Sequence, residues 1–116
     1  MTAEPAPISY VEFQRVDIRV GRIVEVEDFP AARKPAYKLR IDFGAAIGVK
    51  KSSAQVTKYY TKEELLNRLV VAVVNFPPKQ IANFFSECLI LGVYDENNQV
   101  ILLEPGKSVQ NGQKIG

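Results

Sequence analysis

The chain has 116 residues, of which 47% are hydrophobic and 24% charged, and its formal net charge is +2. These values predict a single soluble domain without membrane insertion, because no apolar run is long enough to form a transmembrane helix. The sequence has no histidine and one cysteine, which excludes His–Ser and His–Cys catalytic pairs and argues against a zinc site. Since no glycine-rich phosphate loop occurs either, we expect a protein that is not an enzyme and has no cofactor.

The N-terminal region predicts a flexible tail followed by a short helix. Residues 1–7 are acidic and interrupted by prolines, and they lack the basic start and apolar stretch of a signal peptide. Ser9 and Glu12 have the spacing of a capping box, and Ile8 and Phe13 occupy the positions of a hydrophobic staple. The helix must be short because a strand-like pattern begins a few residues later.

Three extended segments follow this helix. Between Asp17 and Glu27, apolar residues recur at every second position, as in a half-buried strand: Ile18, Val20, Val24 and Val26. Gly21 interrupts the pattern, which predicts a barrel bend where a side chain would clash or φ is positive; the alternative is a regular strand weakened by one glycine. A loop over Phe29–Pro35 precedes a clearly alternating strand, Tyr37–Phe43, and residues 47–53 form the third extended stretch.

The second half of the chain predicts a helix and three more strands. Thr61 and Glu64 form another capping box, which opens a helix over residues 62–68. An apolar strand over Leu69–Val74 then ends at Phe76-Pro77-Pro78. Strands over residues 87–94 and 99–104 form a hairpin around a polar turn.

This order of elements predicts an all-β fold, a five-stranded OB-fold barrel with short helices at the N-terminus and between strands 3 and 4. No repeat or linker divides the sequence, so residues 8–116 are predicted to form one domain that includes both terminal segments. Cys88 lies in an apolar run, which favours a buried thiol over a reactive one. A lone cysteine and the absence of a signal sequence predict the cytoplasm.

The charges are unevenly distributed along the chain. Residues 1–32 have a net charge of −3, residues 33–62 of +7 and residues 63–116 of −2. The basic block supplies the candidate nucleic-acid-binding residues Arg33, Lys34, Lys38, Arg40, Lys50, Lys51 and Lys58. Tyrosines at positions 37, 59 and 60 lie beside them, and cations with aromatic rings are what a nucleic-acid surface requires. The alternative is a solvated basic face with the tyrosines in the core.

Five blocks of sequence occur in the order found in a known family. They are Phe13–Gly21, Lys38–Gly44, Ser53–Thr57, Val74–Ile81 and Ser86–Gly92. With them the chain resembles the tRNA-binding-domain family of OB folds, and more closely its branch of export-related chaperones, CsaA. The resemblance implies a homodimer built partly from the terminal segments, with no enzymatic step. It also implies one of two ligands: tRNA, or unfolded and precursor polypeptides delivered to the Sec export machinery.

Two departures from the tRNA-binding pattern favour polypeptide as the ligand. Relatives that bind tRNA tend to have Ser-Gly-Leu in place of Ser53-Ala54-Gln55, and a Leu-Lys-Pro-Arg-Lys type of segment in place of residues 76–80. The replacement is less basic and more apolar. The candidate peptide-binding residues are therefore Phe76, Pro77, Pro78, Ile81, Phe84 and Phe85. If all six were exposed together, their apolar surface would be larger than the exposed apolar patch of a typical monomer. The alternative for each of them is burial against the barrel or in a dimer.

The leading hypothesis is a dimeric holdase that binds unfolded or precursor polypeptides without ATP. The second hypothesis is a tRNA or structured-RNA binder that uses the basic block. A third is a subunit that docks on another protein, such as a synthetase. We expect the dimer interface to involve the N-terminal helix and the residues after about position 100, where residues 100–103 are apolar.

Overall fold

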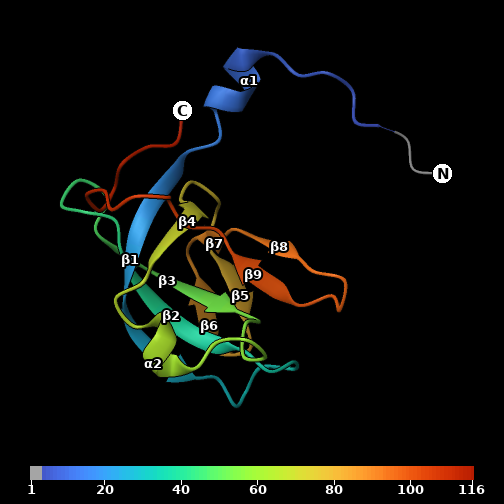
Figure 1. The fold of residues 1–116 in the computed structure, drawn as a ribbon, viewed down its shortest axis with the longest axis vertical. Helices are drawn as coiled ribbons and strands as arrows, with labels where there is room; N and C mark the ends of the chain where they lie inside the picture. The colour runs from blue at the N-terminus through green and yellow to red at the C-terminus, as the bar shows by residue number, and fades with distance from the viewer. Residues whose placement is uncertain (1–3) are drawn as a thin grey trace.

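The structure is a computed structural model that describes residues 4–116. Two short helices and nine strands occur in this part of the chain (Figure 1). In order they are α1 (Tyr10–Gln14), β1 (Ile18–Asp28), β2 (Tyr37–Asp42), β3 (Val49–Ala54), α2 (Lys62–Leu65), β4 (Leu69–Val73), β5 (Lys79–Ile81), β6 (Phe84–Ser86), β7 (Leu89–Ile90), β8 (Gly92–Tyr94) and β9 (Val100–Leu102).

Five strands form an antiparallel sheet in the order β3-β2-β1-β4-β7, and the sheet curls into a nearly closed barrel. Its two edges approach each other where the Glu87 N–H donates to the Lys51 carbonyl at 2.7 Å and the Ser52 hydroxyl donates to the Cys88 carbonyl at 3.2 Å. Helix α2 lies between β3 and β4 in the chain. The predicted fold class, a five-stranded OB-type barrel with two short helices, is confirmed.

The barrel interior contains the alternating apolar residues of the strands. Phe43, Ile23, Leu39, Ile41 and Val70 are among the most deeply buried side chains. Leu65 of α2 is fully buried as well, so this helix covers one end of the core. Burial of this kind is the main stabilising contribution to the fold.

Strand β1 differs from the prediction at one point. The register against β2 shifts between Ile23 and Glu25, so that Val24 is 42% exposed and Ile23 points into the core instead. A β-bulge of this kind inserts one residue and moves the alternation to the other face. At Gly21 a Cβ would lie 2.6 Å from Ile41 Cγ2, which confirms the predicted clash; no positive φ is needed there.

Two further boundaries differ from the sequence prediction. Helix α2 ends at Leu65 rather than near residue 68, because Leu66 is extended and Asn67 has a φ of 69°. The segment after β4, for which no strand was predicted, contains the hairpin β5–β6. The expected strand over residues 87–94 is divided into β7 and β8, and β8 pairs with β9 as a second hairpin.

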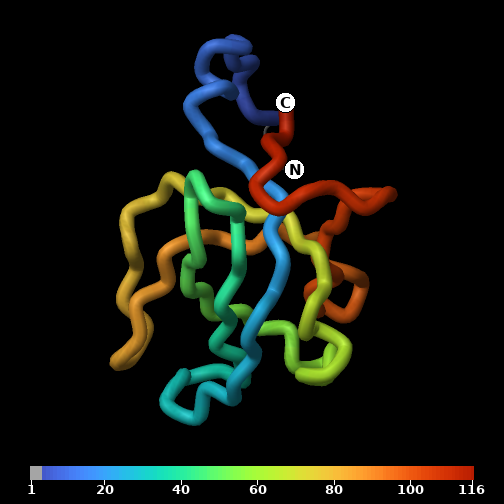
Figure 2. Tube along the Cα trace, turned by 90° about the vertical axis from the view of Figure 1, so that its left-hand side faces the viewer, coloured from blue at the N-terminus to red at the C-terminus, as the bar shows by residue number. Residues whose placement is uncertain are grey.

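The C-terminal end of the chain returns to the start of β1 (Figure 2). The C-terminal segment runs along this strand, with the Ile115 N–H donating to the Ile18 carbonyl at 2.8 Å. Helix α1 stands away from the barrel and has no buried residue. Of the predicted flexible tail, residues 1–3 lie outside the described residues. Residues 4–116 contain no helix that is long and apolar enough to span a membrane.

Candidate binding site beside the β5–β6 hairpin

The hairpin β5–β6 lies against β3, and its Phe84 side chain contacts the outer face of the barrel. Phe84 of β6 packs edge-on against Phe29, with 5.4 Å between the ring centroids. Phe29 is itself buried, at the end of β1. This pair joins the hairpin to the loop between β1 and β2, because aromatic rings prefer such edge contacts.

Two lysines on the outer face of the barrel lie near the Phe84 ring. The Lys51 Nζ lies 5.4 Å from the Phe84 centroid, and the Lys38 Nζ lies 6.0 Å from it and 5.6 Å from the Phe29 centroid. Ammonium groups at this distance are attracted to the face of an aromatic ring. A groove of about 170 Å³ runs between the hairpin and the barrel, lined by Glu25, Glu27, Lys38, Leu39, Arg40, Lys51 and Phe84.

The charges in this groove are largely paired. Strands β1 and β2 place Glu25 opposite Arg40 and Glu27 opposite Lys38. The two ion pairs measure 3.4 Å and 3.9 Å. The pKa of Glu25 is raised, chiefly by hydrogen bonding with the Glu27 carboxyl and by burial, and the charge of Arg40 partly offsets this. Because the acidic strand lies beside the basic one, Lys38 and Arg40 do not form the uniformly basic face that their sequence block suggested.

The other members of the basic block are dispersed. Arg33 and Lys34 are exposed in the β1–β2 loop, Lys58 is exposed after β3, and Lys50 is half-buried. The neighbouring tyrosines are largely engaged within the fold. The Tyr37 hydroxyl donates to the Tyr60 carbonyl at 2.9 Å, and the Tyr60 hydroxyl accepts from the Leu102 N–H at 3.0 Å. These two rings therefore pack against the core, whereas Tyr59 is 40% exposed, so the alternative interpretation holds for two of the three tyrosines.

The predicted peptide-binding residues divide into two groups. Ile81 and Phe84 are half-buried, whereas Pro77 and Pro78 are exposed. Phe76 and Phe85 are 53% and 49% exposed, which is high for aromatic side chains. The structure thus brings an anchored aromatic residue and two uncovered ones together on one short segment.

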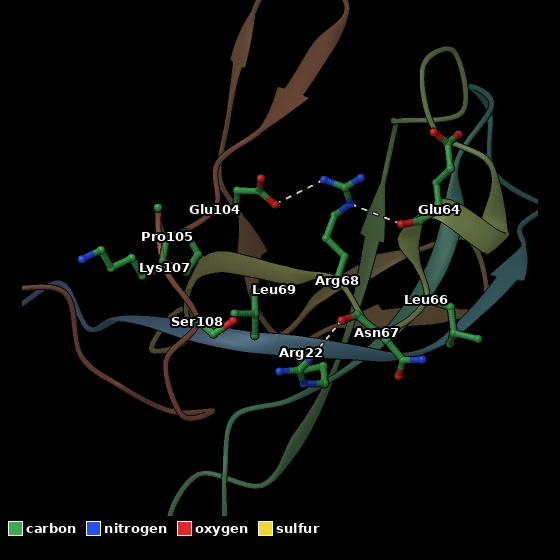
Figure 3. A pocket seen from close by; sticks show the side chains of 11 residues that line it. Arg22, Glu64, Leu66, Asn67, Arg68, Leu69, Glu104, Pro105, Lys107 and Ser108 are labelled. Atoms are coloured by element: carbon green, nitrogen blue, oxygen red, sulfur yellow. Dashed lines mark hydrogen bonds and ion pairs between the residues drawn. The ribbon is translucent and has the colours of Figure 1, made fainter.

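A larger hollow of about 560 Å³ lies elsewhere on the barrel, and its lining residues come from β1, the turn after α2 and the segment after β9 (Figure 3). Its arginines already have partners. Arg68 pairs with Glu104 at 3.3 Å and donates to the Glu64 carbonyl at 3.3 Å, and Arg22 donates to the Asn67 carbonyl at 2.8 Å. None of the predicted binding residues lines this hollow, and its mixed charge favours no ligand.

Cys88 is buried where the chain returns from the hairpin to the barrel. Burial raises the pKa of its thiol to about 12, so the group remains protonated and unreactive at neutral pH. This confirms the interpretation of Cys88 as a core residue. Within residues 4–116, no group of three His, Cys, Asp or Glu is placed to hold a metal ion.

The sequence prediction missed three residues that line the groove, Glu25, Glu27 and Leu39. It also missed Phe29, which packs against Phe84 beside the groove. A signal for the two acids was present: Glu25-Val26-Glu27 and Lys38-Leu39-Arg40 carry opposite charges at the same spacing on successive strands. Such residues face each other when the strands pair in the right register. Phe29 offered no comparable signal, since it lies in a segment that reads as a loop.

A comparison with protein families shows to which family the chain belongs. Residues 18–114 match the family described as "Putative tRNA binding domain". The chain belongs to the tRNA-binding-domain family. Members of this family include solved structures to which the chain is closely similar. The CsaA chaperone protein of Picrophilus torridus is 55% identical with a TM-score of 0.89, and the two superpose over 95% of this chain and 100% of that one.

Other relatives place the family in two contexts. The chaperone CsaA of Bacillus anthracis is 47% identical with a TM-score of 0.89, over 96% of this chain and 100% of that one. Methionine–tRNA ligase of Pyrococcus furiosus is 42% identical over 93% of this chain, which corresponds to 14% of the ligase. The chain therefore spans about one seventh of the length of the curated ligases that it matches.

Proposed function

We propose that this chain is a non-enzymatic, homodimeric, chaperone-like protein of the cytoplasm that binds unfolded or precursor polypeptides along the β5–β6 hairpin. The observation that carries the proposal is the exposure of Phe76 and Phe85 on a segment that Phe84 braces against the barrel. Apolar side chains of an unfolded polypeptide would bury these rings. Pro77 and Pro78 stiffen the segment, so that little conformational freedom is lost on binding.

The charge of the groove favours a polypeptide over a polyanion. Its lining includes three cations and two carboxylates, and Lys38 and Arg40 are already paired. Nucleic-acid affinity depends on cations that can neutralise phosphates, and paired cations do this poorly. Mixed charges beside exposed aromatic rings suit segments of varied sequence, because side chains of either sign find a partner.

The homodimer is supported by apolar surface that the monomer leaves uncovered. Tyr10 and Val11 of α1 are more than 60% exposed, and Val93 and Ile101 are exposed side by side on the second hairpin. Short helices do not persist alone in water and need a packing partner. A second copy of the chain would supply it, with α1 and the residues after about 100 in the interface, as the sequence predicted.

Delivery of the bound precursors to the Sec export machinery is part of the same proposal. It rests on the resemblance to the export-related branch of the family, and similarity to two CsaA chaperone proteins supports it. The absence of ATP from this cycle is expected because the sequence has no phosphate-binding loop.

Binding of tRNA is the second candidate. It is supported by the description of the family, by the methionine–tRNA ligases among the relatives, and by the exposed Arg33, Lys34 and Lys58. These three cations form no ion pair within residues 4–116. They lie in two loops beside the barrel strands, where their charges are available for phosphate contacts.

A titration of the purified protein with total tRNA and with an unfolded polypeptide, each at low and high salt, tests the proposal. Polypeptide affinity should change little with salt, because apolar burial is not screened. Each phosphate contact to RNA would add about −0.7 to −0.9 to the slope of log affinity against log salt. Arg33→Ala with Lys34→Ala should flatten any such slope without altering polypeptide binding. The reverse result, tight tRNA binding and no polypeptide binding, would make RNA the ligand.

A further inference from the structure

Asn75 ties two distant parts of the chain together. Its Oδ1 accepts the Asp17 N–H at 3.0 Å, and its Nδ2 donates to the Arg15 carbonyl at 2.7 Å. The Val74 N–H beside it donates to the Asp17 carbonyl at 2.9 Å. One exposed side chain therefore satisfies two main-chain groups at the junction between α1 and β1.

This junction is the attachment point of the N-terminal helix. Helix α1 has no buried residue, and Figure 1 shows it standing clear of the barrel. Among residues 4–116, the bond from Asn75 Nδ2 to Arg15 is the only hydrogen bond that joins residues 8–16 to the barrel. The side chain of Asn75 is therefore the group of the barrel that bonds to the residues just after α1.

Asn75 also begins the segment that carries the proposed polypeptide site. It follows β4 by two residues and directly precedes Phe76-Pro77-Pro78, the stiff entry to the β5–β6 hairpin. A proline pair restricts the backbone, so the position of the hairpin base and the position of Asn75 are not independent. The base of the hairpin and the base of α1 therefore meet at this residue.

We propose that Asn75 is a positioning residue that presents α1 for self-association and links this association to polypeptide binding on the hairpin. The proposal rests on the function proposed above. A polypeptide that orders the hairpin base also orders Asn75, so α1 loses less freedom when two copies associate. Bound polypeptide therefore tightens the dimer, and by thermodynamic linkage the dimer binds polypeptide more tightly by the same factor.

The variant Asn75→Asp separates the two hydrogen bonds. Aspartate keeps the oxygen that accepts the Asp17 N–H but loses the N–H that is donated to Arg15, and it places a carboxylate oxygen near that carbonyl. Asn67→Asp is the matched control. It makes the same chemical change in the exposed turn after α2, away from the hairpin, where the Asn67 side chain forms no hydrogen bond within residues 4–116.

The dimer dissociation constant is measured by sedimentation velocity, with and without reduced, alkylated ribonuclease A as a permanently unfolded polypeptide. We expect the polypeptide to tighten the dimer at least about fivefold in the unmodified chain and in Asn67→Asp. Asn75→Asp should weaken the dimer by about tenfold and lose the tightening, because one hydrogen bond is missing in each protomer. Polypeptide affinity of the dilute monomer should stay the same in all three proteins.

Equal dimer affinity and equal tightening in Asn75→Asp and Asn67→Asp would overturn the proposal. Hydrogen exchange on the unmodified chain gives a second measurement that does not depend on a variant. The amides of α1 should exchange more slowly when the polypeptide is added, and unchanged exchange would also overturn the linkage. A chain that binds polypeptide but dimerises independently of it contradicts only this inference, whereas a chain that binds no polypeptide contradicts the proposed function as well.

Discussion

Two hairpins leave the barrel, and their surroundings differ. The hairpin β5–β6 is braced by Phe84, which lies among two lysines and Phe29, and it begins with exposed prolines. The hairpin β8–β9 pairs Val93 with Ile101 and exposes both, and Leu102 between its apolar neighbours is buried in the core. Each hairpin exposes apolar side chains, so exposure alone does not distinguish their roles.

The difference lies in the groups around the apolar surface. Strands β8 and β9 contain no charged residue, which is typical of the centre of a lasting interface between subunits. The first hairpin combines aromatic rings with Lys79, Gln80 and the charged groove, and so remains compatible with water when it is empty. This contrast favours self-association through β8–β9 and transient polypeptide binding through β5–β6.

Both hairpins depend on the barrel to which they are attached. The variant Gly21→Val should destabilise this barrel. A Cβ at Gly21 would lie 2.6 Å from Ile41 and from the Phe43 ring, so the core must shift to admit valine. We expect the free energy of unfolding to fall by about 3 kcal/mol, measured by urea denaturation. Gly106→Val is the control, since a Cβ there has no neighbour within 4 Å. Equal stability of both variants would show that the bend at Gly21 tolerates a side chain.

The second hairpin should control the oligomeric state. Replacing both Val93 and Ile101 with Ser removes a cross-strand apolar pair that is 51% and 43% exposed in the monomer. The dimer dissociation constant should rise by about a hundredfold, because each protomer loses the burial of two branched side chains. Light scattering over a dilution series measures this. An unchanged dimer would place the interface elsewhere and remove the contrast between the hairpins.

The first hairpin should control polypeptide affinity. Phe85→Ala removes a ring that is half-exposed in the monomer. Polypeptide binding should therefore weaken by about tenfold, whereas the free energy of unfolding should change little. Fluorescence anisotropy with a labelled unfolded polypeptide measures the affinity. Asn83→Ala at the tip of the hairpin should bind like the unmodified chain. Phe84→Ala, by contrast, should also loosen the hairpin, because Phe84 packs against Phe29.

The smallest effect concerns Cys88, where the first hairpin rejoins the barrel. The pKa of its thiol is about 12 in the folded chain, against an ordinary value of 9.0. The folded state therefore holds a proton that the unfolded state releases between pH 9 and 12. Stability due to this group is complete below pH 9 and falls as the pH rises, by at most about 1.4 kcal/mol per pH unit.

Denaturation of the unmodified chain and of Cys88→Ala at pH 8 and pH 10.5 isolates this contribution. The unmodified chain should lose more stability than the variant over this interval. At neutral pH the thiol should resist alkylation until the chain is unfolded. Rapid alkylation of the native chain would mean that the hairpin opens readily from its base, in conflict with the braced hairpin described above.

Local patterns in the sequence predicted much of the fold. Both capping boxes, at Ser9–Glu12 and Thr61–Glu64, form as expected because they depend only on residues three positions apart. The strand over Tyr37–Asp42 was equally clear, since its alternation is uninterrupted. The prediction that Val24 faces the core was wrong, because a bulge moves the alternation to the other face and the residue types do not reveal it.

The candidate groove was predicted only in part. Phe84 and Lys38 were named for different ligands, whereas the structure brings them together and adds Glu25 and Glu27 to the groove. Phe29 packs against Phe84 beside it. Of the seven cations of the basic block, Lys38 and Arg40 form ion pairs with acidic residues of β1. This pairing depends on which strands pair and in which register, and both are properties of the assembled sheet.

The sequence by itself therefore determined the barrel, its helices and the buried thiol, because caps, alternation and apolar runs act over a few residues. Only the tertiary structure decided which apolar residues brace the fold and which stay exposed, as Phe84 and Phe85 show. It also decided that Asn75 forms hydrogen bonds with Arg15 and Asp17, at the junction between α1 and β1. These outcomes depend on contacts between residues that are far apart in sequence, and such contacts arise only when the strands close into a barrel.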